Sequence, residues 1–171
     1  MAPASDALDI SYEAEFADQS DHGNNPLSVD AQYAHAGVGA RWEEFSARIG
    51  FESFGGSGAA GDKFTTPFAL LHGFNGWADQ FLTTPDAGLE DTYASLQWKR
   101  GKYGLQAWYH DFAADSGGAD YGSEVDLLAT YAVTPRLKVG AKYAAFDSDG
   151  FSEDTDKLWG FFSYSIDVGG D

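Results

Sequence analysis

The sequence predicts an all-β protein, an eight-stranded antiparallel up-and-down transmembrane β-barrel with short turns at one end and long loops at the other. Three observations predict it. Apolar and polar residues alternate along most of the chain. The connections between these segments are short and long in turn. Aromatic residues gather near both ends of the apolar face. With 171 residues the chain is long enough for one domain, so we expect a single β-barrel module over 1–171.

The composition agrees with strands and excludes several classes of protein. Aromatic residues make up 16% of the chain and glycines number 21, which favours strands, turns and bulges over helices. A net charge of −17 argues against nucleic acid as a partner. The absence of cysteine excludes disulfides, and no apolar run is long enough for a transmembrane helix. The first residues lack a signal peptide's basic and apolar regions, so either the signal has been removed or the chain is not exported.

The alternation is clearest from Leu8 to Phe16, where even positions are apolar and odd positions are mostly polar. The same pattern recurs along the chain and predicts eight strands, at about 7–17, 29–42, 45–54, 90–99, 103–112, 123–133, 137–146 and 157–167. Tight turns fall at 43–44, 99–102 and 134–136, and a long loop spans 55–88. All long loops therefore lie at one end of the sheet, which is the layout of outer-membrane barrels.

The orientation of the two faces decides between a membrane barrel and a soluble one. Two aromatic bands lie on the apolar face, one near the short turns (Trp42, Phe45, Trp98, Tyr103, Tyr131, Tyr164) and one near the long loops (Phe16, Phe51, Tyr109, Tyr143). Such bands resemble the girdles at the two membrane interfaces. A soluble barrel would instead turn the apolar set inward. We favour the membrane orientation, in which Leu127, Tyr131 and Val139 face outward.

The opposite face is expected to face the lumen. Its charged and polar residues are Glu13, Glu15, Arg48, Glu52, Lys99, His110, Glu124, Asp126, Lys138 and Lys142. These side chains could line a channel and set its ion selectivity, or form a ladder of cross-strand ion pairs that fills a narrow barrel. We favour the ladder, because the two signs are nearly balanced.

Other groups of residues carry weaker hypotheses. His110, with Glu124 and Asp126 on the next strand, could form a metal or acid–base cluster, but a polar strand face is the favoured interpretation. Acidic residues in the last long loop form a weak calcium candidate: Asp147, Asp149, Glu153 and Asp154. They lack the pattern of an EF-hand, so we favour the interpretation that they are ordinary turn residues. No nucleophile, phosphate-loop or zinc motif is present, so we expect no catalytic residue, no cofactor and no enzyme activity.

The loop at 55–88 is the strongest functional candidate. It is too apolar to stay in water, because it contains the mouth-loop residues Phe68, His72, Phe74, Trp77 and Phe81 together with further leucines and aromatics. Two interpretations stay open. The loop could fold into the barrel mouth as a constriction, or it could pack across the other loops as a cap.

One segment carries a family resemblance. Residues 65–93 read TTPFALLHGFNGWADQFLTTPDAGLEDTY, and this string resembles the corresponding segment of the alginate-export porin family. The segments at 12–26, 108–127 and 146–159 fit as well, so the resemblance covers nearly the whole chain. It implies the last part of an eighteen-stranded outer-membrane channel. The chain departs from the family pattern by running on after Ile166, and eight strands closed on themselves leave no open pore.

The expected function is therefore that of a porin-like β-barrel in a Gram-negative outer membrane. It would transport small or anionic saccharide-type solutes passively, as part of a larger channel. Its expected partners are lipid or detergent, together with polysaccharide or small solutes. The wall is not basic, so the resemblance does not make alginate the substrate. One alternative is a non-conducting small barrel that acts as an anchor or surface-interaction module, and another is a soluble ligand-binding barrel. Substrate and oligomeric state stay open.

Overall fold

The computed structural model describes residues 7–24, 26–67 and 75–166 of the chain. The described residues form eight strands: β1 (Asp9–Ser20), β2 (Asp30–Trp42), β3 (Phe45–Phe54), β4 (Leu89–Arg100), β5 (Tyr103–Ala113), β6 (Asp120–Ala132), β7 (Leu137–Ser148) and β8 (Thr155–Tyr164). No helix in this part of the chain is long and apolar enough to cross a membrane.

The strands form one sheet in the order in which they follow along the chain, β1 to β8, and every neighbouring pair is antiparallel. The predicted all-β fold with eight antiparallel up-and-down strands is confirmed. Each predicted range overlaps its strand, and the largest differences lie at the ends. β6, for example, begins at Asp120 instead of 123, because its pairing with β5 continues past an irregularity beside Phe112 and Ala113.

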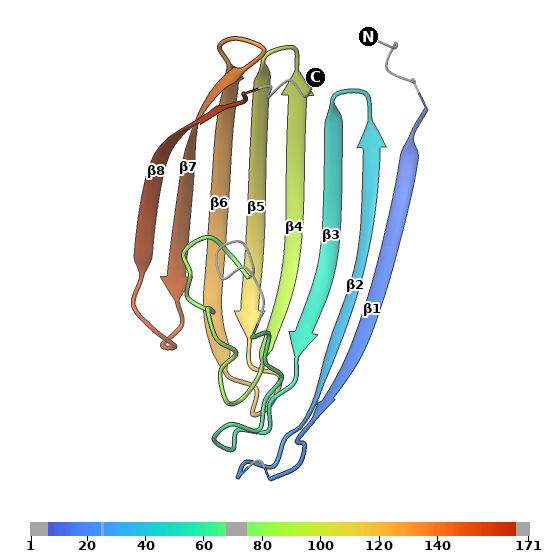
Figure 1. Ribbon diagram of the computed structural model, residues 1–171, viewed down its shortest axis with the longest axis vertical. Coiled ribbons are helices and arrows are strands. Elements are labelled where there is room, and N and C mark those ends of the chain that lie inside the picture. The colour runs from blue at the N-terminus through green and yellow to red at the C-terminus, as the bar shows by residue number, and fades with distance from the viewer. Residues whose placement is uncertain (1–6, 25, 68–74, 167–171) are drawn as a thin grey trace, which may run out of the picture.

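The connections lie as the sequence predicts. Two-residue turns join β2 to β3 and β4 to β5, and a longer turn of four residues joins β6 to β7, all at the same end of the sheet (Figure 1). Glu43 and Gly101 in these turns have φ of 50° and 57°. Positive φ is the conformation that tight hairpin turns require. The long connections, including 55–88, gather at the other end.

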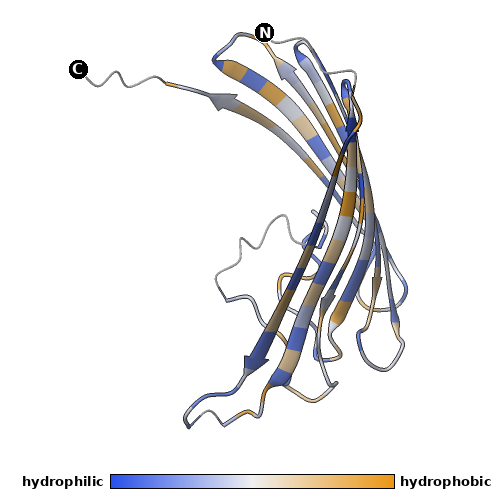
Figure 2. Ribbon diagram, turned by 90° about the vertical axis from the view of Figure 1, so that its right-hand side faces the viewer, coloured by the Kyte–Doolittle hydropathy of each residue, from blue (hydrophilic) through white to orange (hydrophobic). Residues whose placement is uncertain are grey.

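The sheet is curved, and its two edges stand apart (Figures 1 and 2). In the described chain no pairing joins β1 to β8, and contacts between elements occur only between consecutive strands. Closure into a barrel therefore stays a prediction. The described parts of the long loop, 55–67 and 75–88, lie on the concave side of the sheet near the long-loop end, and the opposite face is convex.

The packed core sits where this segment meets the sheet. Its buried members come from this segment, from the strands towards their long-loop ends and from the β5–β6 connection: Phe54, Ala78, Phe81, Leu89, Phe112, Ala114, Tyr121, Ala144 and Phe146. The rest of the sheet is a single layer, so most side chains on the convex face have nothing packed over them.

Candidate functional site: the concave face and the loop folded on it

The register of the strands assembles the polar residues into rows across the concave face. Residues directly opposite in an antiparallel pair point to the same face. One row near the long-loop end contains Glu52 opposite Asp91, and the next contains His110 opposite Glu124. The register puts all ten residues that the sequence predicts to face a lumen on this one face.

Charge is distributed unevenly along the strands. Two adjacent rows in the half of the sheet towards the long loops contain carboxylates and histidines but no lysine or arginine. One row contains Glu15 and Glu52, and the next contains Glu13 and Glu124. The rows nearest the short turns carry lysines, Lys99 in one and Lys138 in the other. The concave face is therefore acidic towards the long loops and basic towards the short turns.

Several of these groups pair across the strands. Arg48 forms an ion pair with Glu13, and His35 Nε2 lies 3.3 Å from the same carboxylate. His110 Nδ1 lies 2.9 Å from a carboxylate oxygen of Asp91. The Tyr33 hydroxyl donates a 2.5 Å hydrogen bond to Glu52. Such pairs are what a cross-strand ladder requires.

Carboxylates on β6 hold the backbone of the loop. The Ala78 amide donates a 2.7 Å hydrogen bond to Glu124, and the Trp77 amide donates one of 3.2 Å to Asp126. Both carboxylates are fully buried. A side chain on residue 76 would collide with the Glu124 carboxylate, and Gly76 also has a φ of 86°, so only glycine fits this approach.

The two carboxyls on β6 each use one oxygen atom to hold the loop. Glu124 Oε1 and Asp126 Oδ2 accept the hydrogen bonds from the loop amides. Glu124 Oε2 and Asp126 Oδ1 are buried, and in the described part of the chain neither has a hydrogen-bond partner.

Further contacts attach the loop to both sides of the sheet. Asn75 donates a 3.1 Å hydrogen bond to Glu52 on β3. Lys157 on β8 donates a 2.7 Å charged hydrogen bond to Asp79. The Thr65 amide donates a 2.7 Å hydrogen bond to Gln19 on β1. The loop therefore spans the concave face from one edge strand to the other.

Aromatic contacts complete the attachment. The Lys142 ammonium lies 4.7 Å from the ring centre of Trp77 and 4.3 Å from that of Trp159, in cation–π geometry with both. Phe81 packs among aromatic rings from three elements, with its ring centre 4.6 Å from that of Phe112. The same segment also contacts another long loop, with the ring centre of Phe81 5.1 Å from that of Phe151 and the Ser152 hydroxyl donating a 2.7 Å hydrogen bond to Gln80, so these contacts fit both the constriction and the cap.

An ion pair and hydrogen bonds also fix the outer part of the loop. Lys63 lies 2.9 Å from Asp86, and its hydrogen bond lowers the pKa of that carboxyl below the usual range. Asp62 accepts hydrogen bonds from Ser57 and from the Asp30 amide, which lower its pKa as well. Both carboxyls are therefore ionised at neutral pH and accept these hydrogen bonds, which stabilise the loop.

The other predicted sites have simpler roles. Of the mouth-loop residues, Phe68, His72 and Phe74 lie outside the described residues. No cluster of His, Asp or Glu that could hold a metal is found in the described part of the chain. Asp154 from the calcium candidate accepts a hydrogen bond from the Ser148 amide at 3.0 Å, as turn residues do.

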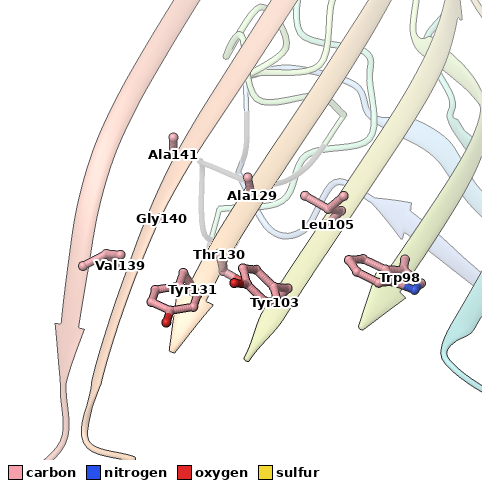
Figure 3. A pocket seen from close by; sticks show the side chains of 9 residues that line it. All are labelled: Trp98, Tyr103, Leu105, Ala129, Thr130, Tyr131, Val139, Gly140 and Ala141. Carbon is pink, nitrogen blue, oxygen red and sulfur yellow. The ribbon is translucent and has the colours of Figure 1, made fainter. Parts of the chain in front are cut away.

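The convex face carries shallow apolar grooves between its side chains. One groove of about 580 Å³ lies near the short turns, lined by Trp98, Tyr103, Leu105, Ala129, Thr130, Tyr131, Val139, Gly140 and Ala141 (Figure 3). The rings of Tyr103 and Tyr131 lie with their centres 5.1 Å apart. These aromatics belong to the band that the sequence predicts near the short turns.

Comparison with protein-family profiles and with curated proteins finds no match to this chain. The resemblance to the alginate-export porins therefore stays an expectation.

Proposed function

We propose that this chain forms part of the wall of an outer-membrane-type channel for small hydrophilic solutes, including saccharides, and that 55–88 narrows the channel. The observation that carries the proposal is the distribution of polarity between the two faces. Tyr12, Leu158 and Phe162 on the convex face are 87%, 77% and 76% exposed, while Glu124 and Asp126 on the concave face are 1% and 0% exposed. A water-soluble protein favours the reverse arrangement.

A bilayer would account for both faces. The exposed apolar side chains of the convex face would contact lipid, and the apolar grooves between them suit acyl chains. The strands have 10–13 residues, enough to cross the hydrocarbon region at a tilt. The polar concave face would then border water, and the resemblance to the alginate-export porins supports the same arrangement.

A second candidate is a non-conducting barrel that anchors acidic surface loops. The described part of the loop favours it, because residues 75–88 pack on the long-loop end of the concave face. Conductance separates the two candidates, since a channel admits ions and a filled barrel does not.

The first experiment is purification with and without detergent, followed by planar-bilayer recording. We expect the chain to require detergent, to migrate differently on gels before and after heating, and to give ion-conducting events in a bilayer. Monodisperse chain in plain buffer would contradict the membrane proposal. Stable insertion without any conductance would favour the anchor.

A further inference from the structure

A polar cleft of about 330 Å³ opens on the concave face, across strands β1 to β5. Its volume lies within the range of small-molecule sites, about 300–1,000 Å³. Hydroxyl and amide groups from three of these strands line it: Ser11, Ser46, Ser95 and Gln97. Hydroxyl and amide side chains both donate and accept hydrogen bonds, so the lining suits a ligand that is rich in hydroxyl groups.

Trp108 forms one wall of the cleft. Its ring stacks on that of His110, with the ring centres 5.8 Å apart and the planes at 11°. The other concave side chains that line the cleft lie in the row of Trp108 or in the next row towards the short turns, whereas His110 lies in the row towards the long loops. The face of the indole that is turned away from His110 is therefore directed to the cleft.

Two N–H donors at the cleft are left unused by the chain. Trp108 Nε1 and Arg48 Nε are buried, and neither has a hydrogen-bond partner in the part of the chain that the structure describes. Neighbouring atoms cover both donors, so a ligand reaches them only with a small rotation of either side chain. A donor that is buried without a partner costs free energy, which a ligand oxygen recovers by accepting the hydrogen bond.

The charges at the cleft are balanced. Arg48 forms an ion pair with Glu13, and Arg41 lies directly opposite Asp9 in the pairing of β1 with β2. A guanidinium beside a carboxylate attracts an anion only weakly, because the two charges largely cancel at a distance. The cleft therefore favours an uncharged ligand over an anionic one.

We propose that the cleft binds a neutral saccharide, with one sugar ring against the indole face of Trp108 and its hydroxyls bonded to Ser46, Ser95 and Gln97. The C–H groups on one side of a sugar ring carry partial positive charge and pack on the electron-rich face of an aromatic ring. This inference rests on the proposed function, because it makes the concave face the surface that a solute meets. It narrows the solutes of the proposed channel to uncharged sugars.

Binding of two matched tetrasaccharides tests the proposal. The full chain is purified in an amine-oxide detergent, which has no sugar headgroup to compete for the cleft. It is then titrated calorimetrically with mannotetraose and with the tetramer of mannuronate, in which a carboxylate replaces each hydroxymethyl group. We expect mannotetraose to bind, and the mannuronate tetramer to bind more weakly or not at all.

Two variants place the site at the cleft. Trp108→Ala should weaken mannotetraose binding about tenfold or more, because it removes the ring face and the indole donor together. Ser46→Ala combined with Ser95→Ala leaves the stacked rings in place and should weaken binding about three- to tenfold. Trp42→Ala is the matched control and should leave the affinity unchanged, because Trp42 lies on the convex face and is 51% exposed. Gel migration before and after heating shows which variants are folded, and the serine variant decides if Trp108→Ala is not.

Three results would overturn the proposal: no binding of mannotetraose, wild-type affinity in the folded cleft variants, or tighter binding of the mannuronate tetramer, which would make the cleft an anion site. A planar-bilayer recording of the same preparation separates these results from failure of the proposed function. A chain that conducts without binding mannotetraose stays a channel and loses the saccharide site. A chain that neither inserts nor conducts removes the proposed function on which the inference rests.

Discussion

At the scale of single residues, the sheet requires glycine where a neighbouring side chain occupies the space that a Cβ atom would need. The Tyr93 ring lies over Gly50 on the neighbouring strand, and a Cβ at position 50 would overlap that ring. The Tyr93 hydroxyl lies 2.9 Å from His35 Nε2, so the ring cannot move without losing this hydrogen bond. Glycine at position 50 is therefore required by packing.

We predict that Gly50→Ala lowers the free energy of unfolding by about 1–3 kcal/mol, the range for overpacking at a filled site. Gly160→Ala is the control, because a Cβ at that position meets nothing within 4 Å. It should change stability by less than about 0.5 kcal/mol. Urea unfolding of detergent-refolded protein measures both, and equal effects would contradict the packing argument.

Glu124 provides a second test at this scale, since it accepts a hydrogen bond from the Ala78 amide while fully buried. Hydrogen bonds to charged groups contribute about 1.5–3 kcal/mol. We therefore predict that Glu124→Ala speeds hydrogen exchange at Ala78 roughly ten- to a hundred-fold. Asp147→Ala removes an exposed carboxylate at the same end of the sheet and should leave this exchange unchanged. Unchanged exchange in Glu124→Ala would show that the carboxylate does not hold the loop.

The sequence predicts the face of each charged strand residue but not its partner. A period of two suffices to put Glu124 and Asp126 on one side of the sheet. Their hydrogen bonds to Trp77 and Ala78 join segments 46 and 49 residues apart, and no local pattern carries that information. Asn75 was missed for the same reason, because its contacts with Glu52 and Asp91 arise only when the loop folds on the sheet.

At the scale of elements, the strands were predictable and the loop was not. Strand positions follow from alternation and turn chemistry, both of which are local. The position of 55–88 depends on which surface can cover its apolar residues, and the sequence left the constriction and the cap open. In the structure, aromatic contacts with Phe112 and Phe146 attach Phe81 to the strands.

We therefore expect residues 75–88 to lose their packing on the sheet together when the ring of Phe81 is removed. Phe81→Ala deletes a ring that is only 6% exposed, and losses of about 3–5 kcal/mol are usual for such a change. We predict faster proteolysis within 75–88 with the strands intact, together with a larger single-channel conductance. Leu82→Ala is the adjacent control, because Leu82 is exposed. If Phe81→Ala loosens the loop without changing conductance, the loop does not narrow the channel.

At the scale of the whole molecule, the two faces of the sheet differ in polarity. Carboxylates lie buried between the sheet and the loop, and large apolar side chains cover the convex face. The predicted up-and-down topology is confirmed, but the edges β1 and β8 stay open in the described chain. Closure could not be read from alternation, because every strand carries the same pattern whether or not its edge is paired.

A charge on the convex face tests the membrane proposal directly. Leu127 lies on that face near the middle of β6, and Gln106 lies on the concave face of the neighbouring β5. In a bilayer, Leu127→Arg would expose a guanidinium to hydrocarbon and should cost about 2–4 kcal/mol, measured by urea titration of folding into lipid vesicles. Gln106→Arg, facing water in the channel, should cost less than about 1 kcal/mol. If the convex face lay in water instead, Leu127→Arg would cost almost nothing, because the position is already exposed. Equal, small costs for the two variants would therefore refute the assignment of the convex face to lipid.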